Sequence, residues 1–348
     1  MSRTMKAGIY HGLQDIRLEE IEMPTVKPGH ALIDTKVSGI CGSDLHQYYG
    51  EWRQPRTKVA TGHELSGIVV EVGDGVSSVS VGDRVCPECF AHCGTCRFCR
   101  IGQYNLCENI RYISQAGYGG FGEYALLPAS ALFKLPNNIS FEEGALVEPL
   151  AVAHRSLLRT GVSRRARIAI LGAGTIGLLC LAVAKVLDFQ EVLITAKYEH
   201  QAKMAENFGA DHVIRVSTQD VRQETKTLFE PHGADVVVDT IALEPTFHDA
   251  VAIVRKAGTI CLVGGYTGSL NLSLGAVVTK ELQLVGSQCY SYSGLSTDFA
   301  AVIELIASQT IDGTPIITHR FPLDDVTAAF KVAADKSSGS IKVLLCQE

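Results

Sequence analysis

A glycine-rich turn between an apolar strand and an apolar helix limits most strongly how this chain can fold. The expected strand is 167–171, and the turn that follows reads Gly-Ala-Gly-Thr-Ile-Gly. In such a motif the first glycine permits a tight turn, and the second lets backbone N–H groups approach a pyrophosphate. The third lets the helix pack closely on the strand, and the helix N-terminus favours negative charge. The motif predicts a dinucleotide site that includes Gly172, Gly174, Thr175, Ile176 and Gly177.

Short apolar strands and helical segments alternate after this turn. Further strands are expected at 192–195, 213–214, 235–239, 259–264 and 282–285. Alternation of this kind is typical of a doubly wound parallel sheet in an α/β protein. Val263 and Gly264, at the end of one of these strands, are additional candidates for contact with the cofactor.

The end of the second strand indicates which dinucleotide is bound. A domain that prefers NAD normally has an acidic residue there, which accepts hydrogen bonds from the ribose hydroxyls. Here Ala196 occupies that position, followed by Lys197 and Tyr198. A small neutral residue removes repulsion toward a 2′-phosphate, lysine adds positive charge, and tyrosine can stack on adenine or donate a hydrogen bond. The pattern favours NADP(H), although Glu199 is an acid three positions along that could reach a ribose.

The first part of the chain has a different pattern. Period-two alternation over 31–39 and apolar segments at 67–73 and 79–85 predict strands. Pro24, Pro28 and Gly29 indicate turns before the first of these strands. At 348 residues the chain exceeds what one hydrophobic core usually serves, so two domains are expected. The first would be largely β.

Four cysteines form the most specific motif of this β-rich part. They follow the spacing C-x2-C-x2-C-x7-C, and they are Cys93, Cys96, Cys99 and Cys107. Four thiolates can close a tetrahedral zinc site that leaves no position for substrate, so the site would be structural. An iron–sulfur cluster is the competing interpretation, but it would require a fourth cysteine sooner and a proline after it. Cys86 and Cys89 form a further pair, interpreted as spare thiols.

A second group of metal-ligand residues lies between residues 41 and 64. Cys41, His63 and Glu64 offer a thiolate, an imidazole and a carboxylate, the kind of set that binds zinc with one position open. Ser43 and His46 lie between them and could move a proton. Glu148 precedes a proline where an apolar helix is expected to begin. Its carboxylate could complement the helix dipole or serve the zinc, and both interpretations remain open.

Composition and charge exclude some other classes. A net charge of -6 and a pI near 6.0 argue against an extended basic face for nucleic acid. The N-terminal residues lack an apolar stretch, and the uncharged run 168–184 contains regularly spaced glycines that favour a buried strand and helix over a membrane span. Eleven cysteines without a secretory signal indicate metal ligands or free thiols. A cytoplasmic protein with no membrane or nucleic-acid partner is therefore expected.

Taken together, these motifs resemble the zinc-dependent medium-chain dehydrogenases, and more closely their sorbitol and butanediol dehydrogenase branch. The likeness rests on 39–46, Gly62-His63-Glu64, the four-cysteine segment, Glu148-Pro149-Leu150 and the glycine fingerprint. It implies a GroES-like β-rich catalytic domain formed by 1–150 and 289–348, and a Rossmann domain formed by 151–288. It also implies a homodimer or homotetramer, and two zinc ions per subunit, one catalytic and one structural.

The resemblance also assigns roles to residues near the catalytic zinc. Cys41 and His63 would be ligands, with Glu64 or Glu148 as the third, and Asp44 would orient the ligand histidine. Ser43 would take the hydroxyl proton and His46 would pass it on. The segment 287–292 lacks the arginine that sorbitol dehydrogenases place there. This difference favours a simpler secondary alcohol or diol over a polyol as the substrate.

The sequence therefore predicts a zinc-dependent, NADP(H)-preferring oxidoreductase that interconverts a secondary alcohol, diol or polyol and a ketone. An NAD-dependent sorbitol or polyol dehydrogenase is the alternative. Zinc-free quinone or enoyl reductases share the architecture but lack the Cys/His ligands and the cysteine segment. A non-catalytic NADPH-binding scaffold is the remaining alternative, and it would bind nucleotide without turnover.

Overall fold

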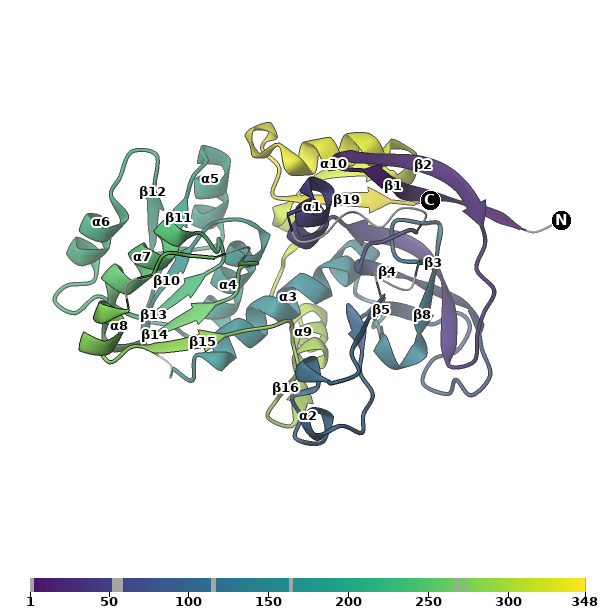
Figure 1. Ribbon diagram of the computed structural model, residues 1–348, viewed down its shortest axis with the longest axis horizontal. Coiled ribbons are helices and arrows are strands. Elements are labelled where there is room, and N and C mark those ends of the chain that lie inside the picture. Colours follow the sequence, from purple (N-terminus) through teal and green to yellow (C-terminus); the bar gives the residue numbers. More distant parts are fainter. Residues whose placement is uncertain are drawn as a thin grey trace. The chain divides into compact units, whose positions relative to one another are not determined.

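The computed structural model describes residues 3–51, 59–113, 117–162, 165–266, 269–272 and 274–347. The chain forms two compact units, shown with their elements in Figure 1. The first unit combines Met1–Glu148 with Gly294–Glu348, and the second is Pro149–Ser293.

The second unit is built on a six-stranded parallel sheet with the order β12-β11-β10-β13-β14-β15. In chain order this is 3-2-1-4-5-6, the order of two mononucleotide-binding halves that meet at β10. The predicted α/β class with a doubly wound parallel sheet is therefore confirmed. The strands are β10 (Arg167–Leu171), β11 (Glu191–Ala196), β12 (His212–Arg215), β13 (Ala234–Asp239), β14 (Val254–Leu262) and β15 (Gln283–Gly286).

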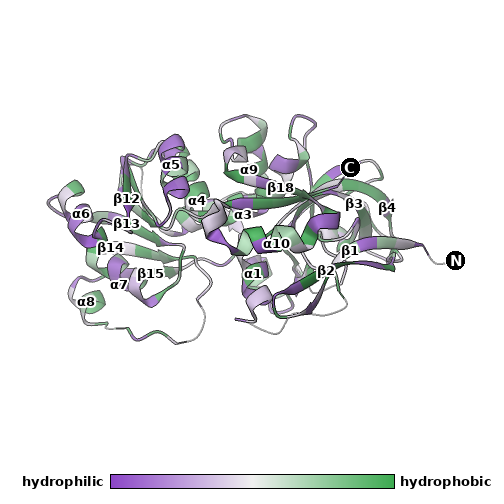
Figure 2. Cartoon of the chain, turned by 90° about the horizontal axis from the view of Figure 1, so that it is seen from above, coloured by the Kyte–Doolittle hydropathy of each residue, from purple (hydrophilic) through white to green (hydrophobic). Residues whose placement is uncertain are grey.

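Both faces of this sheet are covered. Ala169 and Leu171 belong to a cluster on one face, and Ile168 and Ile170 on the other face are equally inaccessible. Such continuous apolar strands are expected of a parallel sheet covered on both sides. The helices that follow β10 in this unit are α4 (Thr175–Val186), α5 (Glu199–Asn207), α6 (Val221–Leu228), α7 (Glu244–Ile253) and α8 (Gly275–Thr279). In Figure 2, α4 is hydrophobic, whereas α5 carries hydrophilic residues.

The predicted glycine turn connects β10 to α4. Gly172 has a φ of 101°, a left-handed conformation that side chains rarely adopt. A Cβ on Gly177 would lie 1.7 Å from the carbonyl oxygen of Gly172. Only glycine lets the first turn of α4 approach the strand so closely, which holds the N-terminus of α4 at the carboxyl end of β10.

The first unit is β-rich. Its main sheet runs β18-β19-β3-β4-β5-β9, with β8 also paired to β3. The unit also contains a hairpin of β1 and β2 and a short pair of β6 and β7. The strands are β1 (Thr4–Gly12), β2 (Asp15–Glu22), β3 (His30–Gly39), β4 (Glu64–Val72), β5 (Arg84–Pro87), β6 (Phe90–Ala91), β7 (Arg111–Tyr112), β8 (Tyr124–Pro128), β9 (Leu132–Lys134), β18 (Ile317–Pro322) and β19 (Lys342–Cys346).

Apolar clusters hold the first unit together. One surrounds Phe330 and includes Tyr10, Tyr48 and Phe121, and another contains Ile33, Leu65 and Leu127 from the strands of the main sheet. The remaining α-helices and short 3-10 helices (η) are α1 (Gly42–Tyr49), α2 (Arg97–Arg100), η1 (Tyr104–Leu106), η3 (Ala129–Ala131), α3 (Phe141–Arg159), α9 (Asp298–Ala307), η4 (Thr314–Ile316), η5 (Leu323–Asp325), α10 (Val326–Ala334) and η6 (Lys336–Ser338). Two further short strands are β16 (Tyr292–Ser293) and β17 (Ser296–Thr297).

Two sequence expectations differ from the structure. The strand expected at 79–85 is mostly a turn, and β5 begins only at Arg84. The Asp83 carboxylate accepts a hydrogen bond of 2.7 Å from the Ser80 N–H, and Gly82 has a φ of 92°, which together form a turn before the strand. Glu148 does not begin a helix, because it lies inside the 19-residue α3.

The uncharged run at 168–184 forms β10 and the greater part of α4. Within the described part of the chain, no helix combines the length and the apolar character that crossing a membrane requires.

Candidate active site and metal centres

Cys41 lies where β3 turns into α1 and caps the first turn of that helix. The Asp44 carboxylate accepts a hydrogen bond of 2.9 Å from the Cys41 N–H, and the Cys41 side chain accepts from the Asp44 N–H. These reciprocal bonds satisfy N–H groups that a helix end leaves without partners. They also fix the direction in which the Cys41 sulfur points.

The structure brings Cys41, His63 and Glu64 together. One donor atom from each lies within 4.8 Å of the others, and Glu64 is 1% exposed. Glu64 is the first residue of β4 and His63 directly precedes it, and Glu64 pairs with Gly39 at the end of β3. This pairing explains why residues from two distant segments converge at one edge of the sheet.

Asp44 and Glu148 lie nearby, but neither belongs to that group. The Asp44 Oδ1 is 4.0 Å from His63 Nδ1, which is an ion-pair distance and longer than a hydrogen bond. Glu148 is 6% exposed, and burial raises the pKa of its carboxyl to about 7. Its charge also acts on the pKa of His63, so it lies within electrostatic reach.

Lys342 is a buried partner of this group. The Lys342 ammonium on β19 contacts the Glu64 carboxylate and donates a hydrogen bond of 3.2 Å to the Ile40 carbonyl. Lys342 is 1% exposed. A Cβ on Gly39 would lie 2.5 Å from Glu64 Oε2 and 2.8 Å from Lys342 Cε, so a larger residue at the end of β3 would displace this ion pair.

The electrostatics of this group suit a divalent cation. Burial and the Glu64 charge raise the pKa of the Cys41 thiol, and burial raises the pKa of Asp44. Burial alone lowers the pKa of His63, but the charges of Cys41 and the carboxylates raise it well above its usual value. Within the described part of the chain, three buried carboxylates and a thiol thus have His63 and Lys342 as their neighbouring cations. A soft-to-borderline ion such as zinc would compensate the remaining negative charge and accept this donor set.

Ser43 and His46 lie on α1, three residues apart, and therefore on neighbouring positions of one helix face. The His46 Nδ1 contacts the Glu51 carboxylate, which is about half exposed. Glu51 was not recognised in the sequence because no pattern linked it to His46. The contact orients the imidazole and connects it to the surface of the unit.

The four predicted cysteines also come together. The sulfurs of Cys93, Cys96, Cys99 and Cys107 lie within 4.8 Å of one another, and among the described residues neither Cys86 nor Cys89 belongs to the group. Backbone N–H groups point at two of these sulfurs, from Cys96 to Cys93 at 3.4 Å and from Asn109 to Cys107 at 3.3 Å.

The ionisation of these thiols also fits a bound cation. Hydrogen bonds from the Thr95 hydroxyl and from backbone N–H groups lower the pKa of Cys93 to about 5. Burial and the neighbouring Cys96 raise the pKa of Cys99 to about 12. The four sulfurs cannot all be thiolates without a cation to compensate them, and a closed zinc site would supply one.

In the second unit, the predicted cofactor residues lie at the carboxyl ends of β10, β11 and β14. Ala196 is the last residue of β11 and 2% exposed. The Lys197 ammonium lies 5.6 Å from the centre of the Tyr198 ring, and that ring stacks on His200. The N–H groups of Val263 and Gly264 donate to the Asp239 carbonyl at 3.0 and 3.1 Å, so these two residues hold the loop after β14 in place.

Two family models match the chain. The model of the alcohol dehydrogenase GroES-like domain matches residues 27–137, and that of zinc-binding dehydrogenases matches residues 175–308. Sorbitol dehydrogenase of Bacillus subtilis (strain 168) is 30% identical over 99% of this chain and 97% of its own length. The chain belongs to the zinc-dependent medium-chain dehydrogenases. The predicted family and the predicted GroES-like and Rossmann-type folds are thereby confirmed, as is the prediction of an alcohol or polyol dehydrogenase.

Solved structures agree with this assignment. An Escherichia coli oxidoreductase of unknown specificity is 31% identical, with a TM-score of 0.92 over 99% of this chain and all of that one. A Sinorhizobium meliloti 1021 protein bound to NADP is 28% identical, with a TM-score of 0.88 over 99% of both chains. This zinc-dependent dehydrogenase also contains a buried residue at its metal-ligand group that sequence analysis missed. Lys342 is a single lysine in the otherwise apolar segment 341–346, and that isolation was the available signal.

Proposed function

We propose that the protein interconverts a secondary alcohol or diol and the corresponding ketone, with NADP(H) as the preferred cofactor. The observation that carries this proposal is the convergence of Cys41, His63 and Glu64 within 4.8 Å in a buried, negatively charged environment. Cys41, His63 and Glu64 would hold the catalytic zinc. Glu148 stays outside the compact group and would act on it electrostatically.

When bound, zinc would polarise the substrate oxygen and the nicotinamide would accept the hydride. The protein's own residues would manage the proton and the ligands. Ser43 would accept the proton of the substrate hydroxyl, and His46 would release it to solvent with Glu51 holding its Nδ1. Asp44 would fix Cys41 through the helix cap, and Lys342 would hold the Glu64 carboxylate in place.

The residues at the end of β11 support the choice of NADP(H). Ala196 leaves no carboxylate at the position that normally binds the ribose hydroxyls, and Lys197 adds a positive charge next to it. The NADP-bound relative from Sinorhizobium meliloti makes this cofactor plausible for the shared fold. For the substrate, the missing arginine in 287–292 favours a simpler secondary alcohol or diol over sorbitol, the substrate named for the Bacillus subtilis relative.

Zinc dependence can be tested with Cys41→Ser and His63→Ala. Each variant should retain nucleotide binding but lose kcat/KM by at least about a thousandfold, since a Lewis acid contributes several kcal/mol to transition-state stabilisation. Elemental analysis should find about two zinc ions per wild-type chain and about one in each variant. Cys346→Ser, a half-buried cysteine outside both groups, is the matched control and should retain both ions. Near-normal turnover without the catalytic ion would refute the proposal.

Cofactor preference can be tested by steady-state kinetics of the wild type and Ala196→Asp with both nucleotides. The wild type should have the lower KM for NADP. The aspartate should change the ratio of kcat/KM for NADP to that for NAD by about tenfold or more in favour of NAD, because a carboxylate repels the 2′-phosphate and binds the ribose hydroxyls. Ala196→Ser is the neutral control. A wild type with the lower KM for NAD would instead indicate the NAD-dependent polyol dehydrogenase.

The substrate class and the assembly require separate measurements. A panel of secondary alcohols, diols, polyols and amino alcohols with NADP should give its highest kcat/KM on a secondary alcohol or diol. Light scattering coupled to size exclusion should give the mass of a dimer or tetramer, the states that the family resemblance implies.

A further inference from the structure

Arg215 lies next to the position that selects the cofactor. It is the last residue of β12, and in the parallel pairing of β11 with β12 it is the partner of Ala196. The carboxyl ends of neighbouring parallel strands share one edge of the sheet, so the guanidinium group of Arg215 starts from the same edge as the adenosine-binding position.

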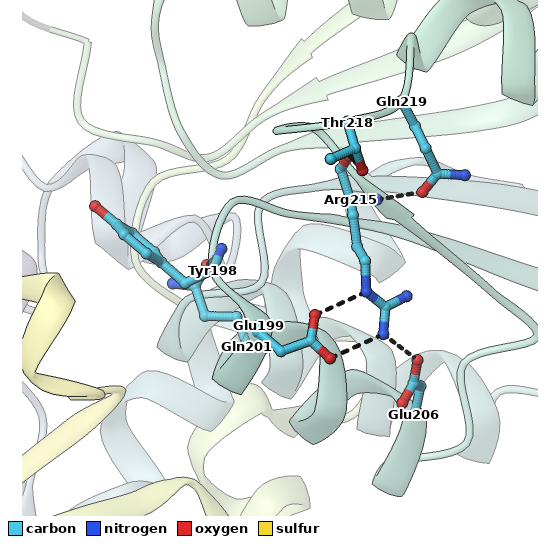
Figure 3. A network of polar contacts seen from close by, with 7 residues as sticks. All are labelled: Tyr198, Glu199, Gln201, Glu206, Arg215, Thr218 and Gln219. Carbon is cyan, nitrogen blue, oxygen red and sulfur yellow. Dashed lines mark hydrogen bonds and ion pairs between the residues drawn. The ribbon is translucent and has the colours of Figure 1, made fainter.

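The guanidinium group holds two carboxylates of α5. Arg215 Nε and Nη2 donate to the two oxygens of Glu199 at 2.9 and 3.3 Å, and Nη2 also donates to Glu206 Oε1 at 2.8 Å. Figure 3 shows the Glu199 carboxylate directed toward Arg215, while the ring of Tyr198 extends in the opposite direction. A two-oxygen contact of this kind restricts direction as well as distance.

The backbone of Arg215 is fixed by the turn after β12. The Gln219 Oε1 accepts a hydrogen bond of 2.8 Å from the Arg215 N–H, and the N–H groups of Thr218 and Gln219 donate to the Arg215 carbonyl at 3.0 and 2.9 Å. The arginine is therefore a positioned group, although its side chain is 34% exposed.

Charge decides what the arrangement does for a bound nucleotide. Arg215, Glu199 and Glu206 together carry a net charge of about −1, and without the arginine they would carry about −2 next to a phosphate of about −2. The hydrogen bond from Arg215 lowers the pKa of Glu199, so this carboxylate is ionised at neutral pH.

We propose that Arg215 contributes to the nucleotide specificity in two ways: it pairs with Glu199 and Glu206, which lowers their combined negative charge, and it turns Glu199 away from the adenosine ribose. This inference rests on the proposed preference for NADP(H). Glu199 is the one acid in the segment 196–200, and a free Glu199 carboxylate would accept hydrogen bonds from the ribose hydroxyls of NAD and repel a 2′-phosphate. The ion pair removes both effects. Preference for NADP over NAD thus depends on the Arg215–Glu199 ion pair as well as on the absence of an acid at residue 196.

A direct contact between Arg215 and the 2′-phosphate is the competing explanation, and the two make different predictions. If Arg215 acts through the carboxylates, the loss caused by its removal is reversed when Glu199 is neutralised. If it binds the phosphate itself, the loss persists in the double variant.

The test measures dissociation constants of NADP⁺ and NAD⁺ by calorimetry for the wild type, Arg215→Ala, Glu199→Gln and the double variant. Arg215→Ala should raise the ratio of the NADP⁺ constant to the NAD⁺ constant by about three- to tenfold at low ionic strength, because it adds about one net negative charge near the 2′-phosphate. Adding Glu199→Gln should return the ratio to within about twofold of the wild type, since the local net charge is then restored. The effect should shrink in 0.5 M salt.

Arg255→Ala is the matched control. Arg255 is 35% exposed and donates to Asp235 Oδ1 at 2.5 Å, but this pair lies at the amino ends of β13 and β14, the opposite edge of the sheet. It should leave the ratio unchanged. A ratio unaffected by Arg215→Ala, or a loss that Glu199→Gln does not reverse, would overturn the inference. A wild type that binds NAD⁺ more tightly would refute the proposed cofactor preference, yet the coupling between Arg215 and Glu199 would still be measured.

Discussion

The candidate active site depends most directly on two buried charged residues, Glu64 and Lys342. Glu64 and Lys342 are each 1% exposed, and each is the other's compensating charge. A buried ion pair seldom adds much net stability compared with apolar residues, but removal of one partner leaves an uncompensated charge. The pair is therefore better understood as a contact that holds the Glu64 carboxylate in position at the candidate metal centre.

Lys342→Met should lower the free energy of unfolding by about 3 to 5 kcal/mol, because Glu64 would remain buried without its cation. Urea unfolding monitored by circular dichroism would measure the change. The double variant with Glu64→Gln should recover most of the lost stability, but it should not recover catalytic activity. A single variant as stable as the wild type would contradict the role assigned to Lys342.

Glu88 gives the first unit a pH-dependent stability. It is 2% exposed, its carboxylate accepts a hydrogen bond of 2.5 Å from the Tyr104 hydroxyl, and burial raises its pKa to about 8. Folding therefore favours the protonated acid. Its contribution is fully present below the pKa of the unfolded chain, about 4.5, and is lost as the pH rises through about 8.

Glu88→Gln should be stabilising, and increasingly so between pH 5 and pH 8.5. The expected gain at the higher pH is on the order of 4 kcal/mol, because glutamine retains the acceptor without a buried charge. Denaturant unfolding at several pH values would measure it. An equal difference between variant and wild type at both ends of that range would show that Glu88 does not titrate there.

At the scale of elements, the cysteine segment 93–107 contains little secondary structure beyond α2 and η1, and its thiols replace an apolar core. Cys99→Ser should remove one zinc ion per chain and expose this segment to proteases, since metal binding supplies folding free energy. Limited proteolysis with and without zinc would detect the cleavage. We expect the catalytic ion to remain, so loss of both ions would contradict two independent centres.

How much was predictable from sequence differs between elements for a physical reason. The turn at 172–177, the strands around it and the cysteine spacing are local patterns, and local turn and ligand chemistry is visible in the residues themselves. The pairing of Glu64 with Lys342 joins residues 278 positions apart, and no local pattern encodes it. The same holds for Arg215 and Glu199, which meet only because β11 and β12 are neighbours. Glu148 was misplaced because an internal proline resembles a helix start.

For the whole molecule, two units with their own apolar clusters should respond to different ligands. In differential scanning calorimetry, NADP⁺ at about 100 times its dissociation constant should stabilise the Pro149–Ser293 unit by about 2.7 kcal/mol. A zinc chelator should destabilise the other unit, which contains both metal-ligand groups. If the chelator and the nucleotide both shifted the same unfolding transition, the two units would not unfold independently.

The position of β19 has a consequence for biosynthesis. Lys342 reaches the Ile40 carbonyl across 302 residues, so the cation that Glu64 requires is translated long after the thiol and the imidazole. At about 5 to 20 residues per second this delay is on the order of 15 to 60 seconds. A nascent chain still on the ribosome therefore has a complete nucleotide-binding unit before it has a finished centre for chemistry. Any product truncated before residue 342 would bind the cofactor without catalysing the reaction.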